Sequence, residues 1–128
     1  MSIIPVMRCN SLRESIKFYT EILDFVRVGG GDDDPDECSV AWLQRGNDEL
    51  ILANEDGEYG TVVVVMTENV DAEFDWFRKR GLKTPGDPNA PKQVHEGPTD
   101  QTWGTREFYV EDPDGNTLRF TQRARSMV

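Results

Sequence analysis

The chain has 128 residues, the size of one ordinary domain, of which 37% are hydrophobic and 30% charged. Its apolar runs are shorter than the ~20 residues of a membrane span, so we expect a soluble protein. Asp and Glu outnumber Lys and Arg by 24 to 14, a net charge of −10, which disfavours binding to nucleic acids and anionic membranes and favours cationic ligands.

The first half of the chain predicts a strand, a helix and three further strands. Residues 3–8 form an apolar run in which Pro5 indicates an edge position or a strand start. A helix capped by Asn10 or Ser11 extends to Asp24, because apolar residues recur there at helical spacing. The remaining strands are expected at residues 25–28, 38–44 and 49–53, the last two joined as a hairpin through the turn 45–48. Between them, residues 32–37 indicate a solvated acidic loop.

The second half repeats this order. Residues 61–66 contain four consecutive valines, which is typical of a strand covered on both faces. A helix capped by Asn69 or Asp71 ends at Gly81. In the Pro- and Gly-rich stretch 84–104 we expect at most one short strand, at 93–96, and residues 105–110 and 117–122 form a closing hairpin. The sequence thus predicts one α+β domain, residues 1–128, built from βαβββ modules at 1–56 and 57–128 that combine into one continuous curved mixed sheet.

The residues at the N-terminus and the two cysteines indicate where the protein resides. The N-terminal residues show neither a basic region followed by an apolar stretch nor a small-residue cleavage pattern, so we expect a cytoplasmic protein. Cys9 and Cys38 are too few and too far apart for a disulfide framework, and no Cys-x-x-Cys spacing indicates zinc. We expect both to be reduced, structural thiols.

Two segments carry a family resemblance. The opening NSLRESIKFY, residues 10–19, and the ending WGTREFYVEDPDGN, residues 103–116, resemble the glyoxalase, bleomycin-resistance and dioxygenase superfamily, also called vicinal oxygen chelate proteins. The resemblance implies two βαβββ modules around a concave cavity and a homodimer, sometimes with exchanged modules. It also implies four metal ligands in the metal-dependent members. Matching the strands places those positions at Ile4, Leu50, Thr61 and Arg119.

These four side chains are a poor ligand set for a divalent metal. Ile and Leu carry no donor, Thr carries a weak neutral oxygen, and Arg brings a competing positive charge. The only histidine, His95, falls in the irregular stretch, and Glu49 is expected to point to the opposite sheet face unless the alignment slips by one residue. We therefore expect no metal and no other cofactor, which favours the metal-free, bleomycin-resistance-like branch.

Alternation along the strands predicts which side chains face the cavity. Phe108, Val110, Leu118 and Phe120 are expected beneath the helices. The opposite, concave face of the closing hairpin and of the other strands is expected to carry Thr105, Glu107, Tyr109, Thr117, Arg119, Thr121, Ile4, Val6, Arg8, Leu50, Leu52, Thr61 and Val63. The expected ligand-binding set is Trp42, Trp103, Glu107, Tyr109, Arg119, Thr61, Leu50 and His95.

Several of these residues have a purely structural alternative. Trp42 could belong to the core, because the strand parity around it is ambiguous, and Trp103 could act as a lid or a dimer contact. Glu107 and Arg119 share a face of paired strands, so a cross-strand ion pair is favoured over acid–base work. His95 could be an ordinary loop residue.

The favoured function is sequestration of a bulky planar or cationic small molecule, such as an antibiotic, without chemistry. Flat rings such as Trp42 and Trp103 can stack on such a ligand. The alternative is a metal-independent isomerase or lyase that uses His95, Glu107 and Tyr109 as acid and base, and a weaker alternative is a dimeric interaction module with a filled cavity. No nucleophile–base pair is evident, so binding is favoured over catalysis and no catalytic residue is assigned.

Overall fold

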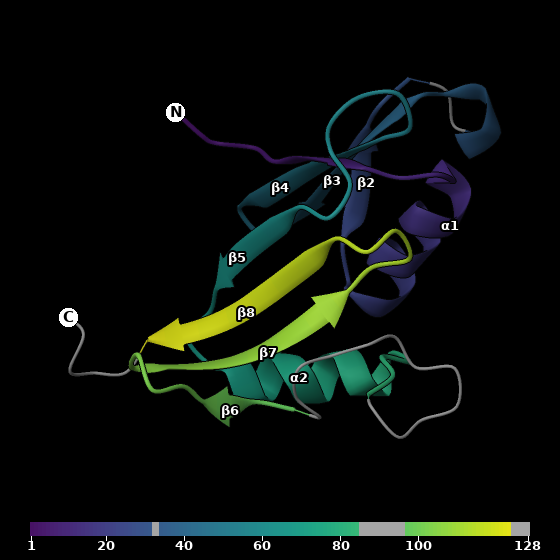
Figure 1. Ribbon diagram of the computed structural model, residues 1–128. Helices are drawn as coiled ribbons and strands as arrows, with labels where there is room; N and C mark the ends of the chain where they lie inside the picture. The colour runs from purple at the N-terminus through teal and green to yellow at the C-terminus, as the bar shows by residue number, and fades with distance from the viewer. Residues whose placement is uncertain (32–33, 85–96, 124–128) are drawn as a thin grey trace. The chain divides into compact units, whose positions relative to one another are not determined.

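Each half of the chain folds into a four-stranded mixed sheet with a helix on one face (Figure 1). The computed structural model describes residues 1–31, 34–84 and 97–123. Two compact units are formed, unit 1 by Met1–Thr61 with Asp112–Asn116 and unit 2 by Val62–Glu111 with Thr117–Val128. The predicted α+β class and the repeated βαβββ order are confirmed, since the strand orders β1-β4-β3-β2 and β5-β8-β7-β6 are equivalent.

Unit 1 places its strands around one central hairpin. Strand β1 (Val6–Arg8) runs parallel to β4 (Asp48–Ala53), which pairs antiparallel with β3 (Val40–Arg45), and β3 pairs with β2 (Val26–Gly29). The predicted hairpin is confirmed: Gly46 takes a positive φ of 60° in the two-residue turn between β3 and β4.

The first helix starts where the sequence predicts a cap. Of the two candidates, Ser11 is the cap, and its side chain accepts a hydrogen bond from the Glu14 amide at 3.2 Å. Helix α1 (Leu12–Lys17) continues as a π-helical turn, η1 (Phe18–Ile22), and the chain reverses at Asp24 with a positive φ of 61°. Leu12, Tyr19 and Leu23 project from this segment into the core of unit 1.

The two faces of the unit 1 sheet are unequal. The face toward α1 carries the buried residues Met7, Ala41, Leu43, Leu50 and Leu52. The other face, here called the helix-free face of unit 1, carries Val6 and Arg8 of β1, Val40, Trp42 and Gln44 of β3, and Glu49, Ile51 and Ala53 of β4. The expectation that Leu50 and Leu52 share a face with Val6 is therefore wrong, and Glu49 and Ile51 take that place.

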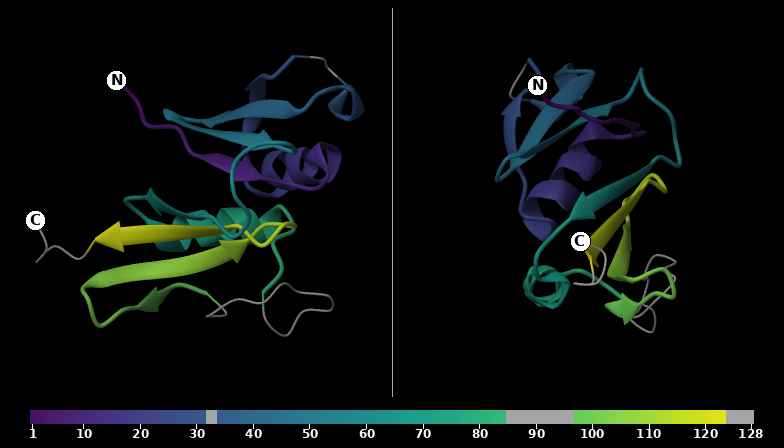
Figure 2. Two further views of the ribbon diagram at one scale, coloured as in Figure 1. Left: turned by 45° about the horizontal axis from the view of Figure 1, so that its top comes forward. Right: turned by 90° about the vertical axis from the view of Figure 1, so that its left-hand side faces the viewer.

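Unit 2 repeats this arrangement around a different hairpin. Strand β5 (Val62–Met66) runs parallel to β8 (Thr117–Arg123), which pairs antiparallel with β7 (Thr105–Glu111), and β7 pairs with β6 (Thr99–Asp100). Helix α2 (Val70–Lys79) is capped by Asn69, one of the two predicted caps, and lies along β7 and β8 (Figure 2). The short strand β6 lies after the predicted strand 93–96, which falls outside the described residues.

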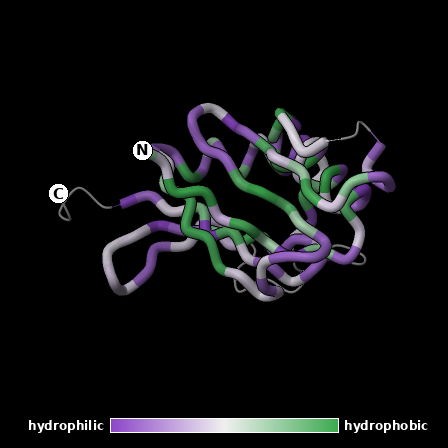
Figure 3. The backbone as a smooth tube through the Cα atoms, turned by 90° about the horizontal axis from the view of Figure 1, so that it is seen from above, coloured by the Kyte–Doolittle hydropathy of each residue, from purple (hydrophilic) through white to green (hydrophobic). Residues whose placement is uncertain are grey.

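An aromatic cluster joins α2 to its sheet. Phe77 contacts Phe120 and Phe108 at ring-centroid distances of 5.1 and 6.2 Å, and Phe108 stacks on Phe120 at 4.9 Å. With Val110 and Leu118 these side chains form the core of unit 2, which confirms their predicted face. The hydrophobic stretches, green in Figure 3, alternate with purple hydrophilic segments, and the described helices include none long and apolar enough to cross a membrane.

Strand β5 differs from its prediction as a doubly covered strand. Val62 and Val64 are 59% and 50% exposed, because they lie on the face away from α2. Val63 and Val65 pair with Leu118 and Phe120 on the helix side, so the expected place of Val63 on the opposite face is wrong. The face away from α2, here called the helix-free face of unit 2, carries Val62, Val64, Met66, Thr105, Glu107, Tyr109, Glu111, Thr117, Arg119 and Thr121.

The turn between β7 and β8 belongs to unit 1. The Asp112 carboxylate is buried and accepts hydrogen bonds from the Tyr19 hydroxyl at 2.8 Å and from the Asn116 backbone and side-chain nitrogens at 2.9 and 3.0 Å. Asn116 also donates to the Arg8 carbonyl at 3.0 Å, and Asp114 accepts from the Ser15 hydroxyl at 2.9 Å. Residues 112–116 therefore form the turn between β7 and β8 and also hold β1 and α1 in place through these hydrogen bonds.

Candidate functional site

The most elaborate polar cluster outside the turns centres on Glu107 in β7. One carboxylate oxygen accepts hydrogen bonds from the Arg119 Nε at 3.0 Å and the Thr121 hydroxyl at 2.9 Å. The other accepts from the Trp103 indole N–H at 2.9 Å and the Thr105 hydroxyl at 2.7 Å. Strand pairing places these groups on the helix-free face of unit 2, since Glu107 lies opposite Thr121. The predicted Glu107–Arg119 ion pair is confirmed, with 2.8 Å between the Arg119 Nη2 and the carboxylate.

Glu107 is an ionised carboxylate held in place by its donors. Its side chain is 0% exposed, and burial alone would raise its pKa. The hydrogen bonds from Thr105, Thr121, Arg119 and Trp103 outweigh this effect and hold the pKa of Glu107 below its ordinary value of 4.5. A fully engaged, ionised carboxylate positions its neighbours and is poorly suited to exchange protons with a substrate.

Two aromatic side chains are fixed by this cluster. Trp103 is 52% exposed although its indole N–H is tied to Glu107, so one face of a large ring is presented at a defined orientation. The Arg119 guanidinium lies 5.2 Å from the centroid of the Tyr109 ring, a cation–π distance. The sequence indicated these residues individually, but the bond from Trp103 to Glu107 was missed because Trp103 precedes the strand and follows no strand parity.

The helix-free face of unit 1 offers a second aromatic surface. Trp42 is 38% exposed and lies opposite Ile51, which in turn lies opposite Val6. This row of apolar side chains crosses three neighbouring strands. The sequence left open which face of the sheet Trp42 occupies. In the structure its ring is accessible, whereas its neighbours Ala41 and Leu43 are buried.

Beside that row lies a basic residue with an aromatic partner. The Arg8 guanidinium lies 5.5 Å from the centroid of the Tyr59 ring, and the Tyr59 hydroxyl donates to the Asn10 side chain at 2.6 Å. Arg8 was expected on this face, whereas Tyr59 was missed because it comes from a turn that shows no periodic pattern. Pairing with a planar guanidinium is a common environment for an exposed Tyr ring.

Two predicted binding residues are placed elsewhere, and a third is not described. Leu50 is buried on the helix side of its sheet. The Thr61 hydroxyl donates to the Glu58 carbonyl at 3.0 Å and its backbone N–H donates to Asn116, so Thr61 stabilises a turn. His95 lies outside the described residues. The structure thus brings together Trp103, Glu107, Tyr109 and Arg119 in unit 2 and leaves Trp42 on the sheet of unit 1.

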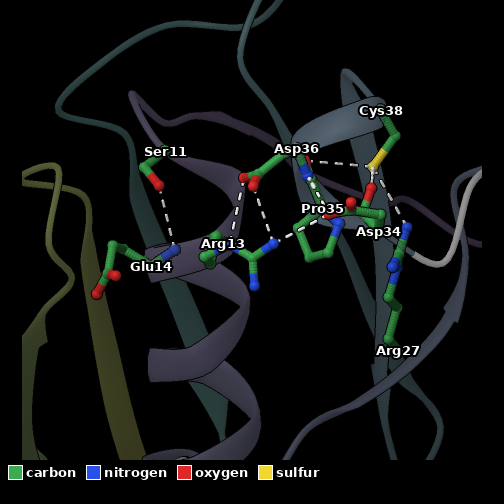
Figure 4. A network of polar contacts seen from close by, with 8 residues as sticks. All are labelled: Ser11, Arg13, Glu14, Arg27, Asp34, Pro35, Asp36 and Cys38. Atoms are coloured by element: carbon green, nitrogen blue, oxygen red, sulfur yellow. Dashed lines mark hydrogen bonds and ion pairs between the residues drawn. The ribbon is translucent and has the colours of Figure 1, made fainter.

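The predicted acidic loop is partly neutralised where it is described. Asp34 and Asp36 each lie 2.9 Å from the Arg13 Nη2, next to the short helix η2 (Pro35–Glu37) (Figure 4). The Arg13 hydrogen bond lowers the pKa of Asp36. The Cys38 thiol lies 3.4 Å from the Arg27 guanidinium, and both cysteines are free. These ion pairs leave less negative charge to attract a cationic ligand than the sequence suggests.

The residues at the family's metal positions do not fit a divalent cation. Leu50 points into the core, the Thr61 hydroxyl is engaged with a backbone carbonyl, and Arg119 is positively charged and bound to Glu107. Over residues 1–31, 34–84 and 97–123, His, Cys, Asp and Glu side chains form no cluster of three or more that could hold a metal ion.

Comparison with solved structures identifies the fold. The bleomycin-binding protein from bleomycin-producing Streptomyces verticillus, complexed with copper(II)-bleomycin, is 23% identical over 95% of each chain, with a TM-score of 0.73. A bleomycin resistance determinant encoded on the transposon Tn5 is 21% identical, covering 96% of this chain and 98% of its own, with a TM-score of 0.75. TioX from Micromonospora sp. ML1 is 17% identical over 100% of both chains, with a TM-score of 0.70.

The sequence itself also matches a family. A search of the curated proteins finds no match, and at such low identities the solved structures establish the fold alone. The family model described as the Glyoxalase/Bleomycin resistance protein/Dioxygenase superfamily, however, matches residues 5–120, nearly the whole chain. Together with the doubled βαβββ fold, this match shows that the chain belongs to the glyoxalase/bleomycin resistance protein/dioxygenase superfamily.

Proposed function

We propose that this protein binds a bulky, planar small molecule and sequesters it without altering it chemically. The observation that carries the proposal is the anchored, half-exposed Trp103, whose indole N–H is held by the buried Glu107 carboxylate. A large ring fixed in this way provides stacking area at little cost in side-chain entropy. Trp42 and Tyr109 provide further aromatic surface on the two helix-free faces.

The similar folds support the same proposal. Two of the solved structures quoted above are bleomycin-binding or bleomycin-resistance proteins. Sequestration requires affinity and shape only, so residues that cannot bind metal do not impair it. We extend the proposal to planar natural products in general, since the sequence identity is too low to carry over a particular ligand.

The contacts of Glu107 favour binding over acid–base catalysis. A general base needs a free lone pair and a pKa near the operating pH, whereas Glu107 is fully engaged and its pKa is lowered. Its ion pair with Arg119 also removes that arginine as a ready electrophile. The alternative of a metal-independent isomerase or lyase therefore has no specific support from the described residues.

We also propose that the protein is a homodimer. Strand β5 exposes Val62, Val64 and Met66 on one face of a sheet edge, and such apolar strands are commonly covered by a partner. Light scattering coupled to size exclusion tests this directly: twice the chain mass is expected, and a monomer at micromolar concentration would contradict it.

The binding proposal is tested by replacing the anchored ring. Calorimetric titration of the native protein with planar peptide and glycopeptide antibiotics, bleomycin included, is expected to give saturable binding by at least one compound. Trp103→Ala should weaken that binding about tenfold or more, since stacking contributes ~1–3 kcal/mol. Trp76→Ala, which removes an exposed ring from the outer surface of α2, is the matched control and should leave affinity unchanged.

A further inference from the structure

Within the part of the chain that the structure describes, Arg8 is a cation without a counter-charge. Its Nε atom is buried and has no hydrogen-bond partner, and the guanidinium packs against the face of the Tyr59 ring. No carboxylate of the described chain forms an ion pair with it. Burying a guanidinium nitrogen without an acceptor costs free energy, so this arrangement is incomplete as it stands.

The position of this guanidinium is set by its surroundings. Strand β1 fixes the backbone of Arg8 opposite Ala53, a small residue that leaves the space above it open to a longer side chain. The loop after β4 passes close to β1: a Cβ at Gly57 would lie 3.0 Å from the Val6 carbonyl oxygen. Tyr59, in the same loop, is held by its hydrogen bond to Asn10. The stacked ring therefore fixes the position of the guanidinium next to this loop.

A second arginine on a helix-free face, Arg119, shows what a satisfied site looks like. Arg119 also stacks on a tyrosine, Tyr109, but its Nε and Nη2 reach the Glu107 carboxylate at 3.0 and 2.8 Å. Arg8 has the same stacking arrangement and lacks the carboxylate. The missing partner is thus an oxyanion, which an arginine fork recognises with two parallel hydrogen bonds.

We infer that Arg8 forms an anion subsite on the helix-free face of unit 1 and that the bound molecule is a planar aromatic compound bearing an oxyanion group. The inference rests on the proposed binding function and specifies its ligand class. Arg8 lies opposite Ala53, which is two residues along β4 from Ile51. Ile51 belongs to the row of Val6, Ile51 and Trp42. Sheet spacings separate the Arg8 and Trp42 Cα atoms by about 12 Å, so the acidic group and the stacked ring would lie at opposite ends of the same ligand.

Three matched compounds test this subsite. The probes are 2-naphthoate, its neutral isostere 2-naphthamide, and 2-naphthyl phosphate, each titrated into the full-length protein while backbone amides of β1 and β4 and the Trp42 indole are followed by NMR. We expect both anions to bind about tenfold more tightly than the amide, because a charge-assisted hydrogen bond is strong. The comparison of the two anions distinguishes a carboxylate from a phosphate ligand.

Substitutions then assign the preference to Arg8. In Arg8→Gln the anions and the amide should bind equally, whereas Arg123→Gln, which removes the same charge from the exposed end of β8, should keep the native preference. If Arg8→Gln does not fold, Arg8→Met serves instead, because its unbranched stem still packs on Tyr59.

Each result has a distinct meaning. The inference is overturned if the anion preference persists in the Arg8 variants or is lost equally in Arg123→Gln. It is also overturned if the native protein shows no such preference. Binding of the amide with shifts at Trp42 but without anion preference overturns the subsite while leaving the proposed aromatic binding intact. Absence of binding by all three probes overturns the subsite, and the antibiotic titrations decide separately whether the proposed function also fails.

Discussion

Glu107 organises the helix-free face of unit 2 at the level of single atoms. A buried carboxylate is unfavourable unless its oxygens are hydrogen-bonded, and here each oxygen has two side-chain donors. The consequence is that Trp103, Thr105, Arg119 and Thr121 are held in fixed positions by one residue. The function of Glu107 is therefore to position aromatic and basic groups.

Replacing this carboxylate should be costly. We expect Glu107→Gln to lower the free energy of unfolding by about 3 kcal/mol, since an amide cannot accept all of the bonds and leaves Arg119 without its counter-charge. Denaturant unfolding measures the change. Glu111→Gln, the same substitution on the same strand and face, should shift stability by less than about 0.5 kcal/mol; equal effects of the two variants would show that the cluster has no special role.

The lowered pKa of Glu107 predicts a pH dependence with a definite sign. Folding depresses the pKa below 4.5, so the stabilisation is fully present above the unfolded-state value and is lost as the pH falls through the folded-state value. Between pH 7 and pH 3 we expect the native protein to lose more stability than Glu107→Gln, with the difference developing below about pH 4.5. Parallel curves for the two proteins would contradict the assigned ionisation. Asp36 and Asp71 also have lowered pKa values, but both proteins contain them. Their contributions to the pH dependence therefore cancel in the difference between the two curves.

At the scale of secondary structure, strand register decides which residues are available to a ligand. The sequence Leu50-Ile51-Leu52 has three consecutive apolar residues, so alternation cannot show which face is buried. Helix α1 resolves this by packing against β4 on the side where Leu50 and Leu52 are buried, which leaves Glu49 and Ile51 on the helix-free face. The four valines of β5 are ambiguous for the same reason.

This register makes a direct prediction. Leu50→Ala should lower the free energy of unfolding by about 3 kcal/mol, the typical cost of truncating a buried leucine. Ile51→Ala, one residue further along the same strand, should cost less than half as much, because its side chain is only partly buried. Thermal or denaturant unfolding of the two variants measures the ratio, and a larger cost at Ile51 would place the strand in the opposite register.

The turn between β7 and β8 acts as an element of unit 1 as well as a connection. Tyr19→Phe removes the hydroxyl that donates to Asp112 at 2.8 Å and should cost about 1–2 kcal/mol, because the buried carboxylate loses a donor. A double-mutant cycle with Asp112→Asn, followed by denaturant unfolding, is expected to show coupling between the two side chains. Additive effects would mean that the bond contributes nothing to stability.

For the whole molecule, the sequence was sufficient for the order of elements and insufficient for the details of the site. Helical spacing after Ser11, the Gly46 turn and the alternation in β7 and β8 each had a local signal, and the fold follows them. Tyr59 beneath Arg8 and Trp103 beside Glu107 come from irregular segments, where no periodicity records which strand a side chain will meet. Contacts of this kind become visible only in three dimensions.

Although the chain has a net charge of −10, part of its negative charge is neutralised locally by ion pairs. Arg13 neutralises part of the acidic loop, and Arg106 pairs with Asp71 and Asp100. Exposed pairs of this kind contribute little to stability but reduce the local potential. The helix-free faces instead carry arginines beside aromatic rings, so under the proposed binding function local groups would select the ligand more than the overall charge does.

We propose that this chain binds a planar molecule and releases it unchanged. The most direct test is a calorimetric titration with planar antibiotics, in buffer with and without a chelator, followed by mass analysis of the recovered compound. We expect saturable binding that is insensitive to the chelator and weakened about tenfold or more in Trp103→Ala, with the compound recovered at its original mass. A chemically altered compound, binding that requires a divalent metal, or binding unaffected by Trp103→Ala would contradict the account.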